Sequence, residues 1–188
     1  MRFIPILFCA ALLPALQGCF PVIAAGIGTG AMMASDRRTS GIYIEDESIE
    51  LKAGKQIGAK YGDVSHVNVT SFNRGVLLTG EAPNEEVRAG IANIAASIAN
   101  VKNVTNEIAI SGISGLASRS SDATITANVK TRFLGSKVFQ ANHIKVVTES
   151  GVVYLMGLVY HAEADAAAES ASTASGVRRV VKVFDYMD

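Results

Sequence analysis

The side chains best suited to chemistry in this 188-residue chain are two cysteines and three histidines. Cys9 and Cys19 lie in an apolar N-terminal stretch, whereas His66, His143 and His161 are spread along the rest of the chain. His66 and His143 hold the same position in an internal repeat. A histidine that occurs in both copies could be a pH sensor or a metal ligand. The simpler interpretation is a surface residue at the start of a strand. No carboxylate cluster or second histidine accompanies either one, as a metal site or an acid–base pair requires.

Other catalytic signatures are also lacking in the sequence. No serine lies in a Gly-x-Ser-x-Gly turn, and the glycines at 26, 28 and 30 precede the repeats, so they do not form a dinucleotide-binding loop. We therefore expect a protein that is not an enzyme and uses no cofactor, metal or small-molecule substrate. The 17 basic and 17 acidic residues argue against nucleic acid as a partner, and the 49% hydrophobic content argues against a disordered chain.

The N-terminal 18 residues have the features of an export signal. A single positive charge at Arg2 precedes an uncharged apolar stretch, residues 3–16, which is short for a membrane-spanning helix and contains two prolines. Apolar character resumes at residues 20–34, so a membrane span is the competing interpretation, although three glycines disfavour a helix there. Removal of the signal would also remove Cys9. Cys19 would then be a free thiol, half of an intermolecular disulfide, or a modified residue.

The four residues Leu16-Gln17-Gly18-Cys19 resemble the lipobox of bacterial lipoproteins. The resemblance implies cleavage before Cys19 and acylation of both its thiol and its new amino group. Several acyl chains on one residue would anchor the protein firmly. Residue 20 is phenylalanine and not the aspartate that resembles an inner-membrane retention signal. In a Gram-negative cell, its absence implies the outer membrane, with the protein facing the periplasm.

Two copies of one pattern make up nearly all of the chain after a Gly- and Ala-rich stretch, residues 20–35. "VNVTSFNRGVLLTGEA" (67–82) aligns with "IKVVTESGVVYLMGLV" (144–159) at a shift of 77 residues, and 98–108 aligns with 175–184 at a shift of 76. A repeat of this kind sets the architecture, because each copy is expected to fold into the same unit.

Each copy predicts the order helix, hairpin, helix, strand. Apolar residues at a spacing of four predict the first helices, hairpin turns are expected at 73–75 and 149–151, and Asp122 with Thr124 is a plausible N-cap region. The second helices are expected at 84–99 and 162–175, and the closing strands at 101–110 and 177–186. Gly80 and Gly157 would permit a turn or a close backbone approach. The apolar trios are Ile49, Ala53 and Ile57, then Ile125, Val129 and Phe133. The fold class is therefore α+β: two tandem αββαβ units, each a three-stranded mixed sheet packed against two helices.

The hairpin endings Val-Leu-Leu-Thr-Gly-Glu and Val-Tyr-Leu-Met-Gly-Leu, with a closing Val-x-x-Val in each copy, resemble the BON domain. With the lipobox and "SDRRTSG", the whole chain is similar to the dual-BON outer-membrane lipoproteins of proteobacteria. The resemblance implies a non-catalytic periplasmic protein that binds anionic phospholipid and supports outer-membrane integrity. The expected boundaries are a signal at 1–18, an acylated cysteine and tether at 19–44, BON domains at 45–112 and 122–188, and a linker at 113–121.

The first helix of the second copy is the candidate lipid site. One stripe beside its core face places an apolar side chain between two lysines, so ammonium groups could meet phosphates while leucine dips toward acyl chains. The candidate lipid-binding residues are Thr124, Lys130, Arg132, Leu134, Lys137, Val138 and Phe139. An ordinary solvated face is the alternative at this helix. For the protein as a whole, the alternative is an adaptor that binds an envelope protein partner, with incidental lipid contact.

Overall fold

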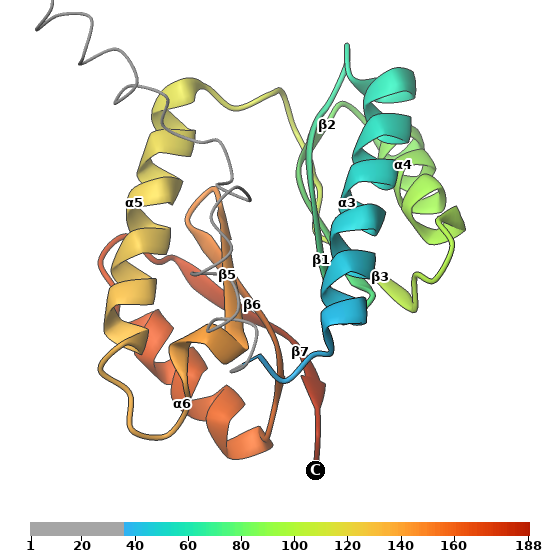
Figure 1. Ribbon diagram of the computed structural model, residues 1–188. Helices are drawn as coiled ribbons and strands as arrows, with labels where there is room; N and C mark the ends of the chain where they lie inside the picture. The colour runs from blue at the N-terminus through green and yellow to red at the C-terminus, as the bar shows by residue number, and fades with distance from the viewer. Residues whose placement is uncertain (1–35) are drawn as a thin grey trace, which may run out of the picture. The chain divides into compact units, whose positions relative to one another are not determined.

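The computed structural model describes residues 36–188, which form one compact unit (Figure 1). The expected signal peptide, Cys19 and most of the expected tether therefore lie outside the described residues. Within 36–188, none of the helices combines the length and the apolar character needed to cross a bilayer.

The first repeat is an αββαβ unit whose last strand is interrupted. Its elements are α3 (Ser40–Tyr61), β1 (His66–Phe72), β2 (Gly75–Ala82), α4 (Glu85–Ser97), β3 (Asn103–Asn106) and β4 (Ala109–Ile110). β1 pairs antiparallel with β2, and both β3 and β4 pair parallel to β2 in one register. The single closing strand expected at 101–110 is split because the Ile108 N–H donates to the Asn106 side chain instead of a neighbouring strand.

The second repeat has the same order with a continuous last strand. Its elements are α5 (Leu116–Phe133), the short 3₁₀ turn η2 (Ala141–His143), β5 (Ile144–Glu149), β6 (Val152–Val159), α6 (His161–Ser172) and β7 (Arg179–Tyr186). β5 pairs antiparallel with β6, and β6 pairs parallel with β7 over eight residues. The α+β fold of two mixed sheets, each with two helices, is confirmed.

Both first helices begin earlier than the sequence pattern indicates. α3 begins at Ser40, inside the segment expected as tether, because the Thr39 side chain caps it by accepting the Ile42 N–H. α5 begins at Leu116, inside the segment expected as linker, directly after Gly115. Asp122 is therefore not near an N-cap but lies within α5, buried. The spacing of four that defines the trios does not continue into these early turns, since it reaches Glu45 from Ile49 and Ser121 from Ile125, so periodicity alone does not reveal them.

In each repeat the helices cover one face of the sheet and enclose a core. The two apolar trios predicted from the spacing of four are all buried, at 5% exposure or less. α6 contributes alanines that are nearly fully buried, so this helix packs close to its sheet. Figure 1 shows α3 and α4 over the first sheet and α5 and α6 over the second.

Gly80 and Gly157 allow a close approach between hairpin strands, as expected. A Cβ atom at Gly80 would lie 2.1 Å from the His66 carbonyl oxygen, and one at Gly157 would lie 2.6 Å from that of His143. Gly80 also has a φ of +112°, which disfavours any side chain there.

The faces of the two sheets that carry no helices share a third apolar cluster, which we call the seam. Its buried members are Phe72, Leu77, Tyr154 and Met156, and the half-buried valines at 147, 152, 181 and 183 and Leu158 pack against them. Polar contacts also cross it, since Lys145 Nζ donates to Glu50 at 2.8 Å and Arg179 pairs with Glu107 at 3.7 Å. The two repeats are thus packed against each other through their sheets.

Candidate functional site

The predicted lipid-binding residues lie at the C-terminal end of α5 and on the loop that follows it. Lys130 and Arg132 occupy the last turn of α5, and Leu134 is its C-cap. Thr124 lies two turns earlier, exposed, and its hydroxyl donates to the Ser120 carbonyl. Thr124 is therefore separated along the helix from the rest of the set.

Phe139, one of the candidate lipid-binding residues, is buried. It is 6% exposed and packs edge-on against Phe133, with ring centroids 5.0 Å apart. Ser136 fixes the loop, because its hydroxyl accepts the N–H groups of Val138 and Phe139. Phe139 therefore anchors the loop to the core and holds Lys137 and Val138 outward.

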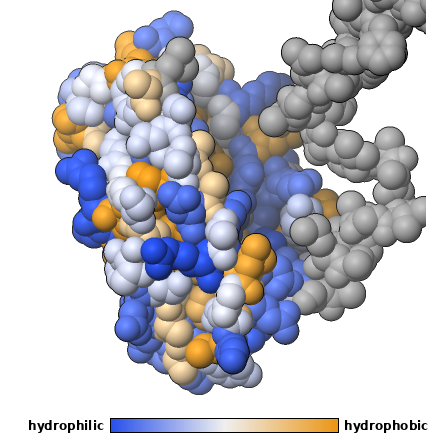
Figure 2. Space-filling view, turned by 90° about the vertical axis from the view of Figure 1, so that its left-hand side faces the viewer, coloured by the Kyte–Doolittle hydropathy of each residue, from blue (hydrophilic) through white to orange (hydrophobic). Residues whose placement is uncertain are grey.

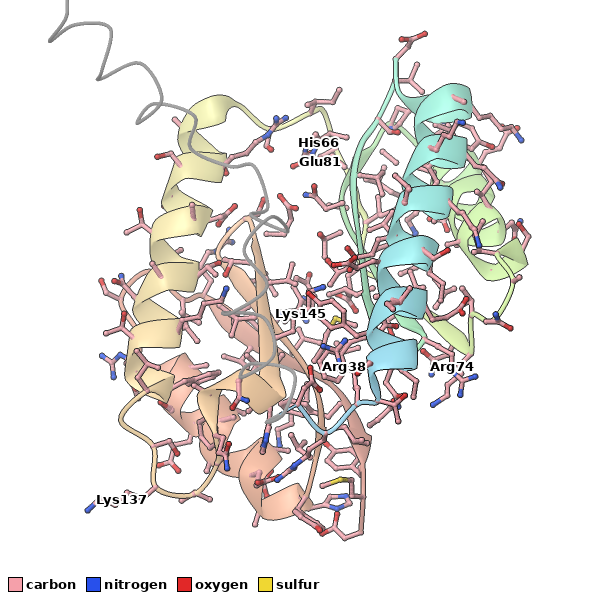
Figure 3. The ribbon with its side chains drawn as sticks, viewed as in Figure 1. Arg38, His66, Arg74, Glu81, Lys137 and Lys145 are labelled. Atoms are coloured by element: carbon pink, nitrogen blue, oxygen red, sulfur yellow. The ribbon has the colours of Figure 1, made fainter. Side chains whose placement is uncertain are left out.

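The remaining residues form what we call the α5-end patch: Lys130, Arg132, Leu134, Lys137 and Val138. Leu134 is 78% exposed and Val138 is 58% exposed, and all three cations are exposed. Figure 3 shows Lys137 pointing away from the folded unit. On the face viewed in Figure 2, hydrophobic residues appear as separate spots among hydrophilic ones. Such a surface suits a charged interface with a few inserted apolar side chains more than a broad apolar one.

The equivalent surface of α3 lacks these side chains. At the shift of 76 residues that aligns the two trios, Gly54 corresponds to Lys130 and Gly58 to Leu134. A Cβ atom at either glycine would meet nothing within 4 Å. α3 does expose one leucine, Leu51, at 73%, beside Lys52 and Lys55. The two first helices therefore share a fold but present different surfaces.

A buried aspartate on each first helix holds the adjacent hairpin turn. The Asp46 carboxylate accepts the N–H groups of Asn73 and Arg74 at 2.8 and 2.7 Å, and the Asp122 carboxylate accepts those of Ser150 and Gly151 at the same two distances. All four turn residues have positive φ, as a two-residue hairpin turn requires. These aspartates were not recognised as structural, because a mid-helix carboxylate resembles a surface residue. Their matching repeat positions could have revealed them.

Three residues before α3, Asp36, Arg37 and Arg38, contact both repeats, and we call them the clasp. Arg37 forms a two-pronged ion pair with Glu163, at 2.6 and 2.8 Å, and donates to the Leu158 carbonyl. Arg38 pairs with Asp36 and with Asp46, and its guanidinium lies 3.9 Å from the centre of the Phe72 ring. The segment directly before α3 is therefore bound to both repeats.

The clasp also lies beside the base of the loop that carries Lys137 and Val138. The η2 turn ends that loop, and Arg38 of the clasp lines one surface pocket together with Asn142 of η2. Hydrogen bonding from Arg37 is the main reason that the pKa of Glu163 lies below its ordinary value. Burial alone would raise the pKa of Asp36, but its hydrogen bonds with Arg38 outweigh burial and lower it.

The histidines do not converge on a site. His66 lies 3.7 Å from Glu81, and His161 pairs with Asp188 at 2.6 Å and stacks on Tyr186. His143 is 7% exposed, so the expectation of a surface residue at the strand entry is wrong for this copy. Across residues 36–188, no three His, Cys, Asp or Glu side chains are placed to hold a metal ion.

The family comparison matches both repeats. The model for the BON domain matches residues 45–112 and again residues 121–187.

Two curated relatives cover most of the chain. It is 36% identical to the outer membrane lipoprotein DolP of Haemophilus influenzae over 175 residues, which is 92% of this chain and 91% of that protein. It is 34% identical to a 21 kDa hemolysin of Actinobacillus pleuropneumoniae over 154 residues, 81% of this chain and 79% of that one. A solved C-terminal domain of CdsD, a structural protein of the Type III secretion system of Chlamydia trachomatis, aligns with 71% of this chain and 96% of its own. Its 11% identity and TM-score of 0.31 support no argument.

Proposed function

Because the chain belongs to the BON domain family, with two BON domains and a DolP relative that matches nearly its full length, we propose that it is an outer-membrane lipoprotein that binds anionic phospholipid. Acylated Cys19 would anchor it on the periplasmic face, and the α5-end patch of the second BON domain would contact the lipid. Through this contact the protein would support outer-membrane integrity.

The observation that carries the lipid-binding proposal is the exposure of Leu134 and Val138 among three cations. An exposed leucine alone needs no explanation, and basic residues at a helix C-terminus also stabilise the helix dipole. Two exposed apolar residues within four positions, held outward by the buried Phe139 and flanked by Lys130, Arg132 and Lys137, fit an anionic interface better. The cations would lie at phosphate level while Leu134 and Val138 reach the acyl boundary.

The position of the clasp supports joint action of the anchor and the patch. The 17 residues from Cys19 to Ser35 reach at most about 60 Å when fully extended. The described part of the chain begins at Asp36, and Arg38 lines one pocket with Asn142 of η2, at the base of the patch-bearing loop. An anchored patch that reaches the same bilayer binds as an intramolecular event, so even a weak patch contact would be occupied often.

Vesicle binding by residues 36–188, which lack the proposed anchor, tests the patch. Leu134→Glu should lower the affinity for phosphatidylglycerol vesicles at least tenfold, because it puts a negative charge where an apolar side chain would enter. Leu51→Glu is the matched control, since Leu51 is an equally exposed leucine on the corresponding helix of the first domain. It should bind as the parent does.

Equal binding by the parent and Leu134→Glu would remove α5 from the proposal. Equal losses in both variants would indicate a nonspecific charge effect. The alternative function is an adaptor for an envelope protein, and it predicts a specific crosslinked partner with no affinity for protein-free anionic vesicles.

A further inference from the structure

The seam between the two sheets is apolar at one end and polar at the other. On the helix-free faces of β1 and β2, Phe72 and Leu77 give way along the strands to Asn68, Thr79 and Glu81. The second sheet contributes Glu149 from the end of β5. Figure 3 shows His66 and Glu81 next to each other at this end of the first sheet. Two carboxylates from different domains are thus enclosed at the polar end.

Few hydrogen bonds offset the cost of burying these two carboxylates. Glu81 is 3% exposed, and within residues 36–188 neither its Oε2 atom nor His66 Nδ1, 3.7 Å away, has a hydrogen-bond partner. Glu149 is 9% exposed; the Asn68 amide donates to it at 3.0 Å, and the nearby Thr79 hydroxyl also favours its ionised form. An ionised carboxylate enclosed in this way is costly, and two of them on facing sheets repel.

We propose that the polar end of the seam makes the packing of the two BON domains proton-sensitive, tighter when Glu149 is protonated and looser when it is ionised. A proton on Glu149 removes its repulsion with Glu81. This change requires no movement of the α5-end patch.

The surroundings of Glu149 raise its pKa, as the proposal requires. Burial is the main reason that its pKa lies above the ordinary value of 4.5, and the charges of Glu81 on β2 and Asp122 on α5 raise it further. Hydrogen bonding from Asn68 and Thr79 opposes this shift. Because the folded state holds this proton more tightly than the unfolded chain, folding stability rises as the pH falls from the raised pKa toward 4.5, and falls as the pH rises through the same range.

The clasp sets the lower end of the pH range in which the two domains pack tightly. The pKa of Glu163 lies below its ordinary value of 4.5 and that of Asp36 below 3.8, so their ion pairs persist above these values and are lost as the pH falls below them. The two domains should therefore pack best between pH 4.5 and the raised pKa of Glu149. Within this window the clasp is charged while Glu149 is neutral.

Urea unfolding of the full chain in detergent, from about pH 5 to about pH 8, tests the proposal. The wild-type midpoint should fall as the pH rises. Glu149→Gln mimics the protonated side chain, so its profile should be flatter and lie above wild type at pH 8. Glu81→Gln is a second variant with the same expectation. Glu169→Gln, an exposed glutamate on α6, should follow the wild-type profile.

A local readout locates the effect in the seam. With fluorophenylalanine incorporated and Phe72 assigned by Phe72→Leu, the ¹⁹F resonance of Phe72 should move with pH in wild type and not in Glu149→Gln. The clasp carboxylates do not titrate in this range, so they do not contribute to that shift.

Three results would overturn the proposal. Parallel pH profiles for wild type and both glutamine variants would exclude the seam carboxylates. Destabilisation of Glu149→Gln at every pH would make Glu149 an ionised acceptor for Asn68. Stabilisation of wild type by Mg²⁺ or Ca²⁺ at about pH 7.5, to the level of Glu149→Gln, would make the polar end a cation site.

Discussion

The two BON domains use their first helices in different ways. On α3, acidic residues make internal contacts: Asp46 holds Arg38 and the hairpin turn, and Glu50 receives Lys145 from the second domain. On α5, Asp122 makes only the turn contacts among the interactions of residues 36–188, and the C-terminal end is left exposed and basic. α3 carries four acidic and three basic residues, whereas α5 carries one acidic and three basic. Duplication of one fold has thus produced one helix that organises the pair and one that is free to meet another surface.

The largest expected effect separates the two buried aspartates. Asp46→Ala should lower the free energy of unfolding by about 3 kcal/mol or more, because it strips the hairpin turn, Ser71 and the buried Arg38 of an acceptor. Asp122→Ala leaves the N–H groups of Ser150 and Gly151 without their acceptor. Because both donors are neutral, the free energy of unfolding should fall by only about 1–3 kcal/mol. Urea unfolding of both variants measures the difference. Equal losses would mean that Arg38 adds nothing to the role of Asp46.

A transplant of the patch gives the next largest effect. In the Leu134→Glu background, Gly54→Lys with Gly58→Leu places a lysine and a leucine at the corresponding positions of α3, where the space is open. Binding to phosphatidylglycerol vesicles should recover by about tenfold, which is about 1.4 kcal/mol. Gly54→Ala with Gly58→Ala fills the same positions without the chemistry and should recover nothing. Failure of the transplant would show that the loop carrying Lys137 and Val138 is also required.

A single lysine gives the smallest effect. Lys137→Gln should weaken anionic vesicle binding by about 1 kcal/mol, roughly fivefold, and should flatten its dependence on salt. Lys55→Gln on α3 is the control and should change neither quantity. A matching loss from Lys55→Gln would assign the binding to overall charge and remove the distinction between the two helices.

The fold was largely predictable from the sequence, because the trios at a spacing of four and the turns at 73–75 and 149–151 appear twice. Lys130 and Leu134 lie on the predicted helical stripe, whereas Lys137 and Val138 lie on the loop after α5, because the helix ends at Phe133. Phe139 was misplaced, because an aromatic residue after a helix gives no sign of whether it turns inward. The helix starts were missed, because the apolar spacing of four does not continue into their early turns.

The seam and the clasp could not be predicted for a different reason. β1 alternates Val67 and Val69 with His66, Asn68 and Thr70, a pattern typical of a strand with one face in water. Its polar face is instead covered by the second sheet. Arg37 and Arg38 find partners 126 and 8 residues away, and such pairing depends on tertiary packing that no local pattern encodes.

The clasp also determines how the folded unit would bear mechanical load. A pull on the chain ahead of residue 36 would reach Arg37 and Arg38 before it reached the first turn of α3. Because the two adjacent arginines form ion pairs with different domains, the force would pass both through Glu163 to α6 and through Asp46 to α3. Tension from the proposed acyl anchor would therefore reach both domains through these ion pairs.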